Sequence, residues 1–261
     1  MPAAPSASAA PSMGGMPGMN TTAAGNGLAD SSGGYRLTSR ATTLPAGRPA
    51  AYRFAIIGPG GKPVTDFEPD QARRLHFYAI RSDLTGFQHL HPVMAQDGTW
   101  TASLASLTPG SWRLFTAFVP AAGPGAGTAL VLSRTATVPG PAAKTALPAP
   151  AATTTADGYT VTVTGQPAAG RQDPLAVTVT RDGKPVTDLE PYLDTYAHLT
   201  AFHDGDEAFA HLHPDGDVSG DRGGPSLPFH ADFAQSGNWR LFLQFQTAGR
   251  LHTAALTLHV A

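Results

Sequence analysis

The sequence predicts an all-β protein built from two tandem immunoglobulin-like antiparallel β-sandwich domains behind a disordered N-terminal tail. The first observation is an internal duplication: residues 61–92 align without a gap on residues 183–214, and both segments end in His-Leu-His-Pro. The second is a series of short β-rich runs between Gly, Pro and Asp turn signals, at the close spacing typical of a sandwich. The third is that no window of a dozen residues keeps a helical period.

The two repeats are expected at residues 34–138 and 158–261. In the first repeat, we expect strands within residues 35–38, 51–57, 75–80, 99–104, 111–118 and 128–132. In the second repeat, we expect them within residues 159–164, 174–180, 196–203, 207–213, 227–233, 238–245 and 251–260. The motif Gly-x-Trp-Arg-Leu-Phe occurs in both repeats, and we expect its Trp112 and Trp239 in the two cores.

Two segments lack the composition of a packed domain. Residues 1–33 are mainly Ala, Gly, Ser, Pro and Met, which cannot bury enough surface to fold, so we expect a disordered tether there. Residues 139–157 are rich in Pro and Ala, a composition that favours an extended, semi-rigid spacer. We therefore expect the linker between the two domains at residues 139–157.

Composition narrows the classes of function. Charged residues make up 14% of the chain, the formal net charge is −2 and no basic stripe occurs, which argues against nucleic-acid binding. The chain contains no Cys, so neither a disulfide framework nor a thiolate metal site is expected. No run of 18 apolar residues occurs, so the sequence predicts no membrane-spanning helix.

The N-terminal composition predicts a location outside the cytoplasm, as a secreted protein or a cell-surface lipoprotein. Residues 1–33 lack the basic start and apolar centre of a signal peptide. They have instead the composition of a tether that follows a removed export signal or a lipidated cysteine. Membrane association is therefore expected only through a removed or lipidated N-terminus.

The second His-Leu-His-Pro motif is the strongest candidate for a metal site. Alternate residues of a strand point to the same face, so two histidines in this motif would present their imidazoles together. Imidazole is a ligand that suits copper, zinc and nickel. His203 has the opposite parity to His198, so these two would share a face only across a bulge. The candidate ligands of the second repeat are His211, His213, His198, His230, His252 and His203.

The first repeat predicts a weaker or degenerate site, formed by His76, His89 and His91. It has Ser103 where the second repeat has His230, and Leu130 where the second repeat has His252. The alternative interpretation is that His76 and His198 are satisfied core histidines and that the His-Leu-His edges face water. A third set of candidates lies in the tail, where the evenly spaced thioethers would suit Cu(I), and consists of Met13, Met16 and Met19.

Catalysis is not expected. The run His-Leu-His-Pro-Asp-Gly-Asp is similar to the metal-binding run of dinuclear zinc hydrolases, but Gly216 stands where their last histidine should be. The chain has no Gly-x-Ser-x-Gly motif and no Cys nucleophile, and no Gly-rich phosphate loop opens a helix. We therefore expect a binding protein, not an enzyme.

Several motifs of the second repeat resemble a bacterial family of exported β-sandwich proteins, the YtkA-like and heavy-metal-binding secreted or lipoprotein domains. The resemblance rests on residues 198–202, 209–214, 229–233, 239–246 and 249–253. It covers most of the second repeat and, more loosely, the first, which lacks the Phe-His and Leu-His-Thr elements. The resemblance implies an exported sandwich that handles heavy metals.

These observations predict an extracytoplasmic copper-binding protein that acts as a buffer, chaperone or resistance factor. Imidazoles would hold Cu(II), or Cu(I) in a mixed site, methionines would hold Cu(I), and zinc is the other candidate ion. The expected partners are the metal ion and a membrane transporter or oxidase. The alternative is a cell-surface immunoglobulin-like interaction protein that binds a partner protein and no metal.

Overall fold

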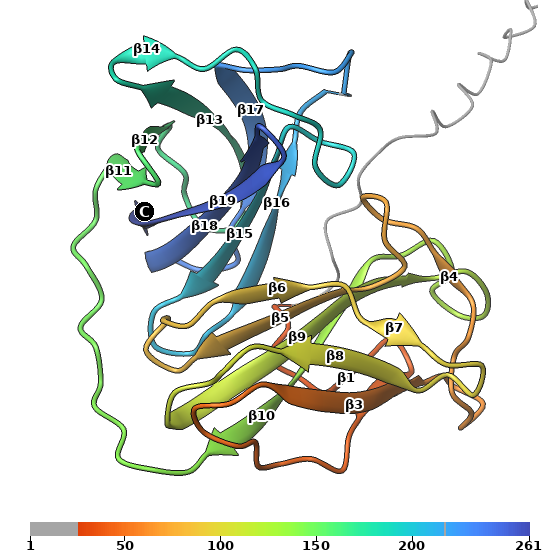
Figure 1. The fold of residues 1–261 in the computed structure, drawn as a ribbon. Coiled ribbons are helices and arrows are strands. Elements are labelled where there is room, and N and C mark those ends of the chain that lie inside the picture. Colours follow the sequence, from red (N-terminus) through yellow and green to blue (C-terminus); the bar gives the residue numbers. More distant parts are fainter. Residues whose placement is uncertain (1–25, 217) are drawn as a thin grey trace, which may run out of the picture.

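The computed structural model describes residues 26–216 and 218–261, apart from the side chain of His211. In this part of the chain the regular secondary structure consists entirely of β-strands, which confirms the predicted all-β class (Figure 1). Two immunoglobulin-like sandwiches pack against each other. No described residue belongs to a helix that is long and apolar enough to cross a bilayer.

The first sandwich consists of two antiparallel sheets. One has the strand order β1 (Ser31–Ser32), β2 (Tyr35–Thr38), β3 (Ala50–Ile57), β8 (Trp100–Leu104) and β7 (Val93–Met94). The other has the order β10 (Leu130–Val138), β9 (Gly110–Pro120), β5 (His76–Arg81) and β6 (Gln88–Leu90), and β4 (Phe67–Glu68) pairs with β9. Between them lies an aromatic core that includes the predicted Trp112, which is 1% exposed.

The second sandwich is one continuous sheet that folds back on itself. Its strand order is β11 (Thr153–Ala156), β12 (Tyr159–Thr164), β13 (Gln172–Arg181), β17 (Ser226–Asp232), β16 (Phe209–Pro214), β15 (Ala197–His203), β18 (Gly237–Thr247) and β19 (Arg250–Val260), and β14 (Lys184–Pro185) pairs with β13. Among the described residues, β16 pairs with β17 through His213 with His230 and through Pro214 with Phe229. The two halves enclose a core that contains the predicted Trp239.

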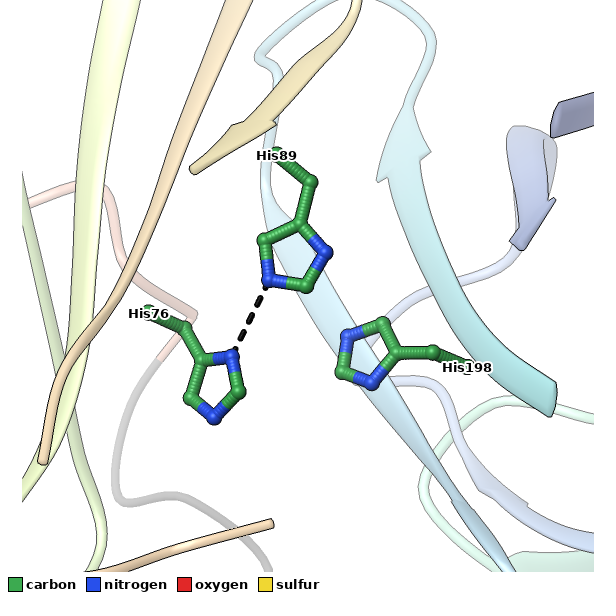
Figure 2. Close-up of side chains that lie close together, drawn as sticks. All are labelled: His76, His89 and His198. Atoms are coloured by element: carbon green, nitrogen blue, oxygen red, sulfur yellow. Dashed lines mark hydrogen bonds between the residues drawn. The ribbon is translucent and has the colours of Figure 1, made fainter. Parts of the chain in front are cut away.

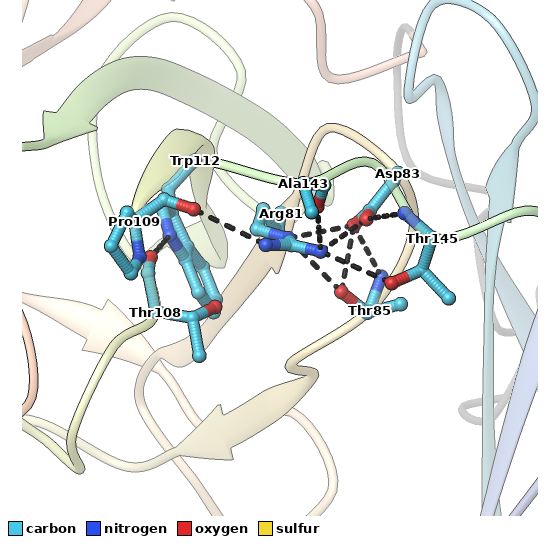
Figure 3. A network of polar contacts seen from close by, with 8 residues as sticks. All are labelled: Arg81, Asp83, Thr85, Thr108, Pro109, Trp112, Ala143 and Thr145. Atoms are coloured by element: carbon cyan, nitrogen blue, oxygen red, sulfur yellow. Dashed lines mark hydrogen bonds and ion pairs between the residues drawn. The ribbon is translucent and has the colours of Figure 1, made fainter. Parts of the chain in front are cut away.

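The segment expected as a linker is partly structured. Strand β11 lies inside it and pairs with β12, because a run of three threonines has the β-branched side chains that strands favour. Further upstream, the segment is fastened to the first sandwich. Arg81 donates to the carbonyl of Ala143, and Asp83 accepts a 2.9 Å hydrogen bond from the backbone N–H of Thr145 (Figure 3).

The two sandwiches are joined by an apolar cluster of their own. Phe87 stacks on Phe242 with ring centroids 4.2 Å apart, and Phe115 packs on Phe209 at 5.5 Å. Phe87 and Phe209 occupy equivalent positions in the duplication, as do Phe115 and Phe242. The interface is therefore close to two-fold symmetric, like the interface of a homodimer. Its buried members are Tyr78, Ile80, Leu84, Phe115, Ala117, Val131, Phe202, Phe209 and Phe242.

Candidate metal centre

Three imidazoles meet between the two sandwiches (Figure 2). His76 begins β5 and His89 lies on β6, whereas His198 comes from β15 of the second repeat. Each offers a ring nitrogen, and these nitrogens all lie within 4.8 Å of one another. His76 is 1% exposed and His198 is 0% exposed, whereas His89 is half-buried, so the contact between the repeats encloses two of the three rings.

Strand geometry explains why these three side chains converge. His89 of β6 pairs directly with Tyr78 of β5, and Tyr78 lies two residues after His76 on the same strand. The three side chains therefore lie on one face of the first sandwich. His198 pairs directly with Gln244 of β18, so these two share the face of the second sandwich that meets the first. The interface aromatic residues hold the two faces together.

The hydrogen bonds fix which nitrogens face the centre. Nε2–H of His76 donates to the carbonyl oxygen of Asp70 at 2.9 Å, and Nδ1–H of His89 donates to Oε1 of Gln244 at 2.7 Å. In neutral rings each imidazole has then used its single N–H. His76 Nδ1 and His89 Nε2 remain, 3.0 Å apart and at hydrogen-bond distance (Figure 2), and in these tautomers each carries a lone pair and no proton.

The surroundings favour the neutral rings that bind metal ions. Burial lowers the pKa of His76. Burial, and to a smaller extent the charge of the neighbouring His76, lowers the pKa of His89 well below its ordinary value. A proton shared between the two facing nitrogens is therefore disfavoured. A metal ion that lies to one side of the line between the two nitrogens would bind both lone pairs without protonating either ring.

Tyr78 supports the third imidazole. Its hydroxyl lies 3.0 Å from Nε2 of His198, and its ring stacks on His89 with centroids 4.5 Å apart. Burial raises the pKa of Tyr78 well above its usual value, so the side chain stays a phenol. Tyr78 thus fixes ring positions from both repeats.

Two of the predicted ligands of the second repeat, His252 and His203, lie apart from this centre. His252 pairs with Phe245, the neighbour of Gln244, so it lies on the inner face of the sheet and His198 lies on the outer face. There it is hydrogen-bonded to Thr247 at 3.0 Å and to Asp157 at 2.8 Å.

His203 is also directed away from the centre, because it is five residues from His198 on the same strand and has the opposite parity. Its Nδ1 lies 2.8 Å from the carboxylate of Asp206, and its Nε2 lies 3.1 Å from the carbonyl of Ser236. Both His203 and His252 therefore stabilise loops and the core of the second repeat.

Besides His91, the remaining predicted ligands divide into three groups. His213 is paired directly with His230, whose Nε2 lies 3.3 Å from Asp215, and burial lowers the pKa of His213. The backbone of His211 lies opposite Thr200, as that of His89 lies opposite Tyr78, but its side chain is outside the described part. The tail ligands are also outside the described residues, namely Met13, Met16 and Met19.

Three supporting groups were not predicted from the sequence: Tyr78, Gln244 and the backbone carbonyl of Asp70. Each contributes through a contact with an imidazole that only the tertiary structure creates. The duplication itself contained one usable signal. Histidines at equivalent positions of two repeats meet near the axis when the repeats pack symmetrically, and His76 and His198 do so, with ring centroids 5.6 Å apart.

Comparisons with known proteins give a family. A family model described as "Domain of unknown function (DUF8832)" matches residues 30–130 and 153–261. No curated protein matches the chain in sequence. Among solved structures, the chain is similar to the adhesin FdeC of Escherichia coli, with 16% identity over 88% of this chain and 65% of that chain, at a TM-score of 0.28.

Two further solved structures show the same level of similarity. InvD of Yersinia pseudotuberculosis has 14% identity over 87% of this chain and 57% of that chain, at a TM-score of 0.28. The tandem Ig repeats of Dlar have 10% identity over 87% of this chain and 97% of that chain, at a TM-score of 0.23. The chain thus spans less than two thirds of the FdeC and InvD chains.

Proposed function

The chain belongs to the family described as "Domain of unknown function (DUF8832)", and since that description leaves its activity open, we propose that the protein binds a transition-metal ion between its repeats. The ligands are His76, His89 and His198. The preferred ion is copper, and zinc is the second candidate. The resemblance to YtkA-like proteins points in the same direction and remains a prediction.

One observation carries the proposal, the pair of nitrogens that face each other at 3.0 Å, His76 Nδ1 and His89 Nε2. Histidines that bind metals usually donate their other ring N–H to a carbonyl or carboxylate, which fixes the tautomer and the ring orientation. Asp70 and Gln244 supply these acceptors. An ion bonded to both nitrogens at 2.0–2.1 Å would subtend an angle of about 95° between them, which a copper ion accommodates.

The donor set supports copper as the first choice of metal. The three donors are imidazoles, and the chain has no Cys, so thiolate ligation does not contribute. Among divalent first-row ions, affinity for nitrogen donors rises to a maximum at Cu(II). The protein would then act outside the cytoplasm as a copper buffer, chaperone or resistance factor that exchanges its ion with a membrane transporter or oxidase.

Equilibrium dialysis of the full chain against Cu(II) and Zn(II), with metal content measured by mass spectrometry, tests the proposal. We expect one tightly bound ion per chain and a loss of tight binding in His89→Ala. The matched control is His259→Ala, because His259 is exposed and its Nδ1 lies 3.1 Å from Oδ1 of Asn238, which is not a predicted ligand. Wild-type affinity in His89→Ala would contradict the proposal, because the ion would then be bound elsewhere. No binding by the wild type would also contradict it and would favour an interaction protein without metal.

A further inference from the structure

A fourth histidine borders the centre. His91 follows β6, two residues after His89, and both belong to the first His-Leu-His-Pro motif. The ring centroid of His91 lies 4.8 Å from that of His89 and 5.2 Å from that of His76, and it stands edge-on to both rings. A rotation of the His91 side chain would therefore let its ring nitrogen bind an ion that His76 and His89 hold.

The two sides of the His91 ring differ in their environment. The side chain as a whole is half-buried, whereas its Nε2 is enclosed and has no hydrogen-bond partner among the described residues. A buried nitrogen without a partner loses its hydration and gains nothing in return, so it calls for an explanation such as an ion or a ligand. A neutral ring can carry its proton on Nδ1 and leave the lone pair on Nε2.

His91 also differs from the three other rings in how it is held. His76 is bonded to the carbonyl of Asp70, His89 to Gln244 and His198 to Tyr78. Within the part of the chain that the structure describes, no hydrogen bond restrains the His91 ring. It can therefore turn toward the centre or away from it without breaking a hydrogen bond.

On the basis of the proposed function, we infer that His91 is the exchangeable fourth ligand of the centre and the one through which the ion enters and leaves. It completes a four-nitrogen shell, the coordination number that zinc prefers and copper readily adopts. Three donors then come from the first repeat and one from the second. The fixed donors hold the ion, and His91 closes the side of the centre that is nearest to solvent.

The test compares the full-length wild type with His91→Gly, which leaves space for added imidazole. We expect His91→Gly to bind Cu(II) about tenfold to 100-fold more weakly and to lose it faster to an external chelator. Added imidazole should restore both values. It should also return the visible spectrum of bound Co(II) to that of the wild type, because in the variant alone water replaces the fourth imidazole and shifts the absorption bands. In the matched control, His259→Gly, imidazole should change nothing.

The possible outcomes distinguish the role of His91 from the existence of the three-histidine centre. Equal affinity, exchange rate and Co(II) spectrum in wild type and His91→Gly would overturn the role of His91 and leave the three-histidine centre intact. Weaker binding that imidazole does not restore would overturn it as well, because the loss would then come from packing. Failure of the wild type to bind Cu(II), Zn(II) and Co(II) would overturn the metal centre itself.

Discussion

Substitution of Gln244 separates the metal-binding role of the histidines from a purely structural one. Its Oε1 accepts the 2.7 Å hydrogen bond from His89 Nδ1–H, and this bond leaves His89 Nε2 free to bind an ion. Gln244→Leu removes the acceptor with little change in size. Loss of such an outer acceptor typically lowers metal affinity 10–100-fold, or about 1.4–2.7 kcal/mol.

Gln244→Glu makes the opposite change, because a carboxylate accepts the same hydrogen bond more strongly and raises the basicity of the ring. We expect its Cu(II) affinity to equal or exceed that of the wild type. Without metal, Gln244→Leu leaves His89 Nδ1–H unpaired in a buried position, so the free energy of unfolding should fall by about 1–3 kcal/mol.

The assay is a titration of Cu(II) against a competing chelator, together with urea unfolding of the metal-free proteins. Gln246→Leu is the matched control, since Gln246 lies two residues further along β18 and its amide contacts Glu190, not a histidine. Wild-type affinity in Gln244→Leu, or an equal loss in Gln244→Leu and Gln244→Glu, would refute the reasoning from ring tautomers.

Three further predictions concern stability. Burial alone would raise the pKa of Asp83, but hydrogen bonds from Arg81, Thr85 and Thr145 outweigh it and hold that pKa well below its usual range. Asp83→Asn should therefore cost about 3 kcal/mol near pH 7. In urea unfolding at a series of pH values, the difference from wild type should persist above about pH 4 and shrink as the pH falls further. Below that pH the carboxylate of the unfolded wild type takes up a proton while the folded one, with its lowered pKa, stays ionised; a constant difference would contradict this. Phe202 is 0% exposed and packs between the repeats, so Phe202→Ala should cost about 3–5 kcal/mol in chemical unfolding. It should also weaken Cu(II) binding in the folded protein, whereas Phe233→Ala, in the core of the second repeat, should lower stability alone. Cu(II) at 100 times its dissociation constant should add about 2.7 kcal/mol to the free energy of unfolding of the wild type. The same Cu(II) concentration should add nothing for His89→Ala, and equal stabilisation of both proteins would point to binding elsewhere.

The fold could be predicted because its signals are local or repeated. The duplication, the alternation within strands and the turn residues between them indicated two all-β repeats, and the motif tryptophans are in the cores as expected. The exception is β11, which was assigned to the linker. Its threonines favour a strand only because β12 offers a partner.

The candidate centre could be predicted only in part. The alternation of side chains along a strand predicts which face of the sheet a residue lies on, but it does not predict which element packs against that face. His76, His89 and His198 were all expected to be candidate ligands, yet they were assigned to separate sites in separate repeats. The symmetric packing of Phe87 on Phe242 and of Phe115 on Phe209 brings them together. No local pattern encodes this contact.

His252 also shows that the sequence does not predict which histidines share a face. Its motif predicted a strand that neighbours the His-Leu-His-Pro strand, whereas β15 and β18 lie between β19 and β16 in the sheet. His252 pairs with Phe245 instead of Gln244, and this difference of one residue places its side chain on the opposite face of the sheet. Register between distant strands is fixed by packing of the whole sandwich, and the sequence of one strand does not reveal it.

The most direct test of the account is anomalous diffraction at the copper edge from crystals of the Cu(II)-loaded full-length protein. We predict one strong peak between the two repeats, bonded to His76 Nδ1 and His89 Nε2 and within reach of His198. A peak beside His213 and His230, or a peak confined to one repeat, would contradict a centre shared by the two sandwiches.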